Sequence, residues 1–163
     1  MSGEYTGGQK ESLTVTLTGC KRAGEACSSL GAGAGEIVSS ALEGEVGFIS
    51  GRATKKPVIG LDLKREVALL TATCGSGLTK TVLTVEGSVI GAIKPTAKMT
   101  LEETLKFTAS AGRQAPESFQ EGEADTLVES LLTGAQKTSE PAGLTATVKL
   151  KSEEPMEIKT RVV

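Results

Sequence analysis

The three cysteines are the side chains of this chain that are best suited to chemistry. Cys20 and Cys27 bracket the insert KRAGEA directly after a predicted strand, and Cys74 ends a later one. A bridge between Cys20 and Cys27 would close a short loop and stabilise the fold by about 2–3 kcal/mol in the chain-entropy model. The sequence therefore favours a Cys20–Cys27 disulfide, with reduced structural thiols as the alternative. Three cysteines without histidine make a poor zinc site, and no base is identifiable that would activate Cys74 as a nucleophile.

Paired carboxyl groups are the second candidate, because glycosidases use two of them about 5–10 Å apart in a cleft. Glu43 and Glu45 share a predicted strand face, as do Glu121 and Glu123. Surface strands of acidic proteins show the same pattern, so we interpret both pairs as solvent-facing. Glu103 is different, since it falls on the otherwise apolar face of its strand. We expect Glu103 to reach solvent beyond the sheet or at a bulge; buried, it would be the first site to inspect.

The composition argues against most other chemistry. The 163 residues carry a net charge of −2 and include no His, Trp or Asn. Without His the chain forms no Ser-His-Asp or Cys-His triad, and the commonest metal ligand is missing. Three Phe and one Tyr offer few stacking surfaces for sugars or bases. The lack of Asn fits thermal adaptation, engineering and chance equally.

Cofactor, nucleic-acid and membrane signals are weak as well. The run GAGAGE at 31–36 lacks the spacing of a phosphate-binding loop, and no helical pattern follows it. Lys and Arg are scattered rather than clustered. The chain has no apolar run of membrane-spanning length, and its first residues lack the apolar segment of a signal peptide. We therefore predict no cofactor, no metal, no nucleic-acid partner and no membrane insertion.

The elements that must position these side chains are predicted to be β-strands. Across residues 81–93 apolar side chains recur at alternate positions, and the alternation resumes over 99–107. Side chains of a strand alternate between faces, so each segment has one apolar and one polar face. Two such segments joined by a short turn predict a long antiparallel hairpin. Gly87 and Gly91 on its apolar face indicate bulges or the close approach of a covering element.

The rest of the chain alternates in the same way. Further strands are predicted at 12–18, 36–41, 45–50, 58–63 and 67–74, with a turn at 64–66 and a polar connection at 134–143. The chain is predicted to end in a hairpin over 144–162 with its turn at 152–155. Residues 125–132 fit a helix or a strand, and their β-rich surroundings favour the strand. We expect residues 1–11 to be a flexible lead-in or weak edge strand and residues 12–163 to be a single β domain. The predicted fold is all-β, an antiparallel β-sandwich or β-barrel of about nine to eleven short strands.

Several phrases resemble a group of uncharacterised secreted or cell-surface proteins of high-GC Gram-positive bacteria. They are GEYTG (3–7), LTVTLTGC (13–20) with Cys27, GEIVSSALEGEVGFI (35–49), IGLDL (59–63), TVEGSVIGAIKPTAKM (84–99), GRQAPESFQEGEADTL (112–127) and AGLTATVKLKSEEPMEIK (142–159). The group carries Asn near 96–98 and 152–154, where this chain has none. The resemblance implies a signal peptide and an extra Cys-bearing β segment before GEYTG. That segment would offer Cys27 or Cys74 a partner, so whether Cys20 pairs with Cys27 or Cys74 is open.

These observations predict a protein that is not an enzyme. The leading hypothesis is an extracellular or cell-surface structural or binding domain that self-associates through edge strands. Other proteins or a cell-surface polymer are further expected partners. The alternative is a virion structural protein, such as a tail component or a capsid decoration, and a carbohydrate-binding module is less favoured because aromatic residues are scarce.

Overall fold

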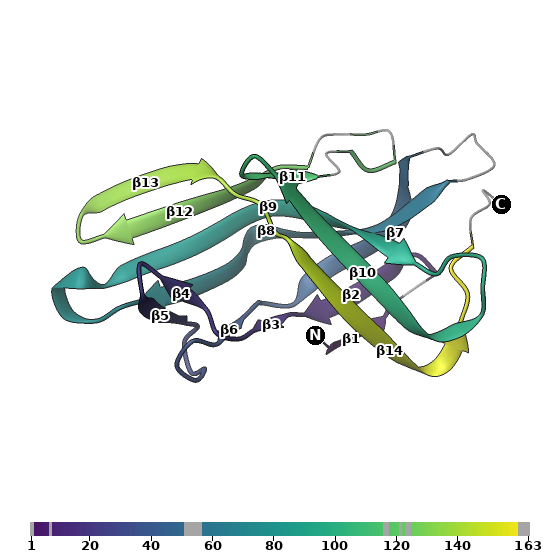
Figure 1. The fold of residues 1–163 in the computed structure, drawn as a ribbon, viewed down its shortest axis with the longest axis horizontal. Coiled ribbons are helices and arrows are strands. Elements are labelled where there is room, and N and C mark those ends of the chain that lie inside the picture. Colours follow the sequence, from purple (N-terminus) through teal and green to yellow (C-terminus); the bar gives the residue numbers. More distant parts are fainter. Residues whose placement is uncertain are drawn as a thin grey trace.

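The computed structural model describes residues 2–6, 8–50, 57–115, 118–120, 122 and 125–159 (Figure 1). In this part the protein is all-β and antiparallel, as predicted, and its only helical element is the short 3-10 turn η1 (Gly77–Thr79). No helix in these ranges is long and apolar enough to cross a membrane. The strands are β1 (Ser2–Tyr5), β2 (Lys10–Thr14), β3 (Thr16–Leu17), β4 (Lys21–Arg22), β5 (Glu25–Ser28), β6 (Ile37–Val38), β7 (Leu42–Ser50), β8 (Val58–Cys74), β9 (Thr81–Lys94), β10 (Thr100–Ser110), β11 (Arg113–Ala115), β12 (Leu127–Thr133), β13 (Gln136–Pro141) and β14 (Ala146–Met156).

One long sheet organises the molecule. Its strands run in the order β1-β2-β7-β8-β9-β10, and β14 pairs with the far side of β10. The first half of β9 instead pairs with β12, which pairs with β13. Figure 1 shows β10 and β14 crossing diagonally over the layer that contains β2, β7 and β8. The sheet is thus folded over itself like a sandwich and does not close into a barrel, because in the described residues β1 and β14 are not paired with each other.

The predicted hairpin over 81–107 is confirmed as β9 and β10, but the two strands pair directly only between Ala92–Lys94 and Thr104–Lys106. The predicted close approaches are also confirmed. Gly87 has φ +112°, and a Cβ there would lie 1.8 Å from the Thr126 carbonyl oxygen. A Cβ at Gly91 would lie 2.6 Å from the Leu105 side chain of β10. Glycine at these positions lets neighbouring chain segments cross the sheet at close range.

The turns predicted at 64–66 and 152–155 are wrong. The charged residues of these segments lie within strands, at an irregular position of β8 and on the edge strand β14. Residues 64–66 lie inside the continuous β8, where the register to β9 shifts between Lys64 and Ala68. Such a bulge bends a strand without ending it. Residues 152–155 lie inside the edge strand β14, where they interrupt its pairing with β10: Lys151 pairs with Glu102, and the next pair is Met156 with Thr100.

Three other segments differ from the prediction or decide between alternatives. Residues 1–11 contribute β1 and the start of β2, so the edge-strand alternative describes them better than a flexible lead-in. Residues 136–141, expected within a polar connection, form β13. Residues 127–133 are strand β12, which confirms the preferred reading of 125–132.

The interior contains two apolar clusters. The larger lies between the folded-over layers and includes Leu61, Leu63, Leu105 and Phe107, each at most 1% exposed. The smaller surrounds Cys27 and Cys74 at the β5 end of β8. Apolar burial between these layers is the main stabilising contribution that an antiparallel sandwich of this kind can draw on.

Candidate functional site

The disulfide joins Cys27 to Cys74, so the predicted Cys20–Cys27 pairing is wrong. Antiparallel pairing of β5 with β8 places Cys27 directly opposite Cys74, and both are buried. Cys20 is a free, half-buried thiol, whose carbonyl oxygen accepts a backbone hydrogen bond from Cys27 at 3.0 Å. The bridge therefore fastens residues that are 47 positions apart in sequence. Disulfides are typical of oxidising compartments.

Of the predicted carboxylate pairs, only Glu43 and Glu45 lie in the described residues, and neither lines the apolar cavity described below. Glu43 is exposed, as expected, and Glu45 is half-buried. Gln120 donates a hydrogen bond to Glu45 at 3.0 Å, which occupies one of its oxygens. Glu121 and Glu123 lie outside the described residues.

Glu103 is only 3% exposed, so the expectation that it reaches solvent is wrong, and its candidacy as a buried charge is confirmed. It shares the inward face of β10 with Leu105 and Phe107, because the strand alternates without interruption there. Its Oε1 atom has no hydrogen-bond partner in the described structure. Desolvation raises the pKa of its carboxyl group.

A second buried acid, Glu11 of β2, accompanies Glu103 in the interior. Glu11 is 5% exposed and packs over Gly44, where a Cβ would lie 2.6 Å from Glu11 Cγ and 3.1 Å from a Leu61 methyl group. Burial and then the negative charge of Glu103 raise the pKa of Glu11 from 4.5 to about 7. Sequence reasoning missed Glu11 because it lies at the end of the presumed lead-in; its place two residues before Leu13, on one strand face, was the available signal.

A third group of polar side chains lies on the face of β8 and β9 that points away from Leu61 and Leu63 of the main core. Ser88 donates a hydrogen bond to Asp125, and the Lys64 ammonium lies 3.6 Å from Asp62 and 3.8 Å from Glu45. Burial raises the pKa of Asp125 to about 6 and also raises the pKa of Asp62, against the lowering effect of Lys64. Within the described residues, no group of three His, Cys, Asp or Glu side chains could hold a metal ion.

These contacts have an evident structural role. Asp125 precedes β12, and its bond to Ser88 fixes the start of that strand on β9. Nearby, the backbone N–H of Gln120 donates to the Phe48 carbonyl at 2.7 Å, and the Phe119 ring covers Gly47. These contacts therefore hold Phe119, Gln120 and Asp125 over the sheet.

An apolar cavity of about 200 Å³ lies between β8, β9 and the strands that cross them. The residues that line it are Val15, Leu17, Ser39, Leu42, Leu63, Leu69, Leu70, Val85, Val89, Phe107, Leu127, Glu129, Ala142, Gly143, Leu144, Ala146 and Val148. None of the four carboxyl groups with raised pKa is among them. The four carboxyl groups with raised pKa and the cavity are thus separate features.

Comparisons with protein-family models, curated proteins and solved structures find no match to this chain. The geometry of the chain itself is therefore the basis for its functional assignment.

Proposed function

We propose that this chain is a non-enzymatic structural domain of the cell surface or extracellular space, which assembles by pairing the free edge of β14 with the same edge of a second copy. The observation that carries the proposal is β14 itself. It is 11 residues long and pairs only with β10 in the described structure, so its other edge presents unpaired backbone groups. Such an edge is a template for pairing with another chain.

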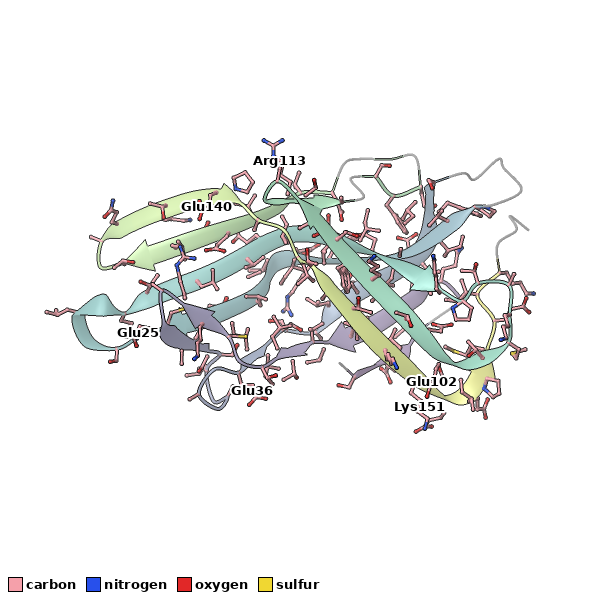
Figure 2. All side chains as sticks on the ribbon, viewed as in Figure 1. Glu25, Glu36, Glu102, Arg113, Glu140 and Lys151 are labelled. Atoms are coloured by element: carbon pink, nitrogen blue, oxygen red, sulfur yellow. A yellow bond between two sulfur atoms is a disulfide. The ribbon has the colours of Figure 1, made fainter. Side chains whose placement is uncertain are left out.

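The charges on β14 complement each other across a two-fold axis. Regular pairing of β14 with β10 runs from Ala146 to Lys151, and the register then shifts before Met156. At this shift, antiparallel pairing of two copies centred on Ser152 sets Lys151 of each copy opposite Glu153 of the other. On the other side of β14, Lys151 lies opposite Glu102 of β10. Figure 2 shows Glu102 and Lys151 close together near one end of the β10–β14 pair, with Lys151 pointing away from the ribbon. A row of alternating charges, Glu102, Lys151 and then the second copy's glutamate, would favour this register over others.

Two further observations support the proposal. The Cys27–Cys74 bridge suits an oxidising compartment, which the resemblance to secreted proteins also implies. The acids with raised pKa offer little to a substrate, because Glu11, Asp62 and Glu103 are each at most 5% exposed and lie outside the apolar cavity. They suit a folded scaffold better than a catalytic cleft.

Sedimentation velocity over a range of protein concentrations tests the assembly. We expect the wild-type protein to sediment as a dimer or larger assembly as its concentration rises. Lys151→Glu converts two symmetry-related attractions into repulsions and should raise the dissociation constant by about tenfold or more. Lys137→Glu on β13 makes the same charge reversal on another exposed edge strand and should have no effect. A wild-type protein that stays monomeric throughout would contradict the proposal.

A further inference from the structure

We infer that the apolar cavity between β8, β9 and the crossing strands is a binding site for a small, uncharged, apolar molecule. The test of this site is separate from the test of the proposed assembly, because Lys151 and Glu153, whose charges carry the assembly, do not line the cavity. The inference rests on the volume of the cavity, on the chemistry of its wall and on the pairing of its polar groups.

The volume sets the size of the ligand. A cavity of about 200 Å³ exceeds the roughly 150 Å³ of an engineered apolar cavity that stays dry and accepts benzene or xenon. It falls below the range of about 300–1,000 Å³ that is typical of sites for larger ligands. The cavity therefore suits a molecule of about one ring or a short hydrocarbon chain.

The wall sets the polarity of the ligand. Fifteen of the lining residues have aliphatic or aromatic side chains or are glycine, and only Ser39 and Glu129 have polar side chains. The Ser39 hydroxyl accepts a hydrogen bond from the Val15 N–H at 2.9 Å and donates one to the Ser40 carbonyl at 2.7 Å. The Ser39 hydroxyl hydrogen is therefore already donated to the Ser40 carbonyl, so Ser39 cannot donate a hydrogen bond to a polar ligand without breaking that bond.

Among the described lining residues Glu129 alone is charged, and its charge is matched by Arg22. Arg22 of β4 donates to the Glu129 carboxylate at 2.5 Å, and the two side chains are 39% and 22% exposed. A charged ligand could pair with Glu129 or Arg22 only by breaking their ion pair. An uncharged ligand avoids the loss of that interaction. The matched charge thus favours a neutral molecule.

The wall is assembled from rigid elements. Leu63 of β8, Val89 of β9 and Phe107 of β10 are each at most 5% exposed and belong to the main core. On the adjacent strand β14, Ala146 pairs with Phe107 and Val148 pairs with Leu105. A preformed apolar site of this kind binds without a large ordering cost.

Benzene is a suitable probe, with pyridine as a polar molecule of the same shape. We expect benzene to produce saturable shifts in methyl NMR signals of lining Val and Leu residues, and pyridine to bind about tenfold more weakly or less, because its ring nitrogen loses water without gaining a partner. Ala146→Leu extends a side chain into the cavity and should weaken benzene binding by about tenfold or more. Ala26→Leu makes the same change at an exposed position of β5 that does not line the cavity and should leave binding unchanged.

Val148→Leu is a second variant that reduces the cavity volume, because it adds one methylene to a lining side chain. It should also weaken benzene binding, and it replaces Ala146→Leu in the test if that variant does not fold. The inference is overturned if folded wild-type protein shows no saturable benzene shifts. Equal binding of benzene by a folded filling variant, or equal binding of pyridine by the wild-type protein, would also overturn it.

Discussion

Replacing Glu11 with glutamine should change how the stability of the protein depends on pH. Glu11 is 5% exposed, and burial together with Glu103 raises its pKa from 4.5 to about 7 in the folded state. The folded protein therefore holds a proton on Glu11 more tightly than the unfolded chain does. Its contribution to stability is present in full below pH 4.5, falls as pH rises toward 7 and is lost above that value.

The size of the effect follows from the difference in pKa. A rise from 4.5 to about 7 corresponds to a loss of about 3 kcal/mol in the free energy of unfolding across this window. The raised pKa values of Glu103, Asp62 and Asp125 act in the same direction, so the wild-type decline should exceed the Glu11 contribution. Glu11→Gln removes the Glu11 part and should be the more stable protein at about pH 8.

Urea unfolding between about pH 4 and 8.5, with the disulfide intact, measures this difference. Glu43→Gln is the matched control, because it removes one exposed carboxyl group from the neighbouring strand. We expect the curves for the wild type and Glu43→Gln to run nearly parallel, while Glu11→Gln falls by about 3 kcal/mol less. A Glu11→Gln curve parallel to the wild type would refute the reasoning that Glu11 is buried with a raised pKa.

Two other changes test the framework of the fold. Cys74→Ser breaks the bridge to Cys27, which closes a loop of 47 residues, and should lower the free energy of unfolding by about 2–5 kcal/mol in denaturant titrations; equal stability would mean that the bridge does not form. Gly87→Ala places a Cβ 1.8 Å from the Thr126 carbonyl oxygen, so it should destabilise the protein by several times the roughly 1 kcal/mol expected of Gly134→Ala. Gly134 also has a positive φ, +59°, but no atom lies within 4 Å of its Cβ position, and equal losses in thermal melts would contradict the predicted clash.

The sequence predicts the strands of this fold better than it predicts their partners. Alternation identifies β9 and β10, since burial on one face imposes a period of two on each strand. Alternation alone does not determine register, and register decides that Cys27 lies opposite Cys74 rather than bonding to Cys20. The same limit applies at Lys64, where a charged stretch predicts a turn and the sheet instead absorbs it as a bulge within β8.

For the candidate sites, too, the sequence identifies some residues but does not predict how they are packed. Glu103 stands out in the sequence because it interrupts an apolar face, although the pattern does not show whether the strand buries it. Glu11 is harder to recognise, since the polar, Gly-rich residues before it do not suggest a strand. The apolar cavity has no sequence signal, because it exists only where β14 crosses β8 and β9. Long-range packing decides all three outcomes.

The most direct test of the proposed assembly is a charge exchange on β14, measured by sedimentation velocity. Lys151→Glu alone sets the introduced carboxylate of one copy opposite Glu153 of the other and should weaken association. The double variant Lys151→Glu/Glu153→Lys restores opposite charges across the two-fold axis, so it should recover most of the wild-type affinity. Failure of the double variant to associate better than Lys151→Glu, in protein that remains folded, would contradict pairing of two copies through β14.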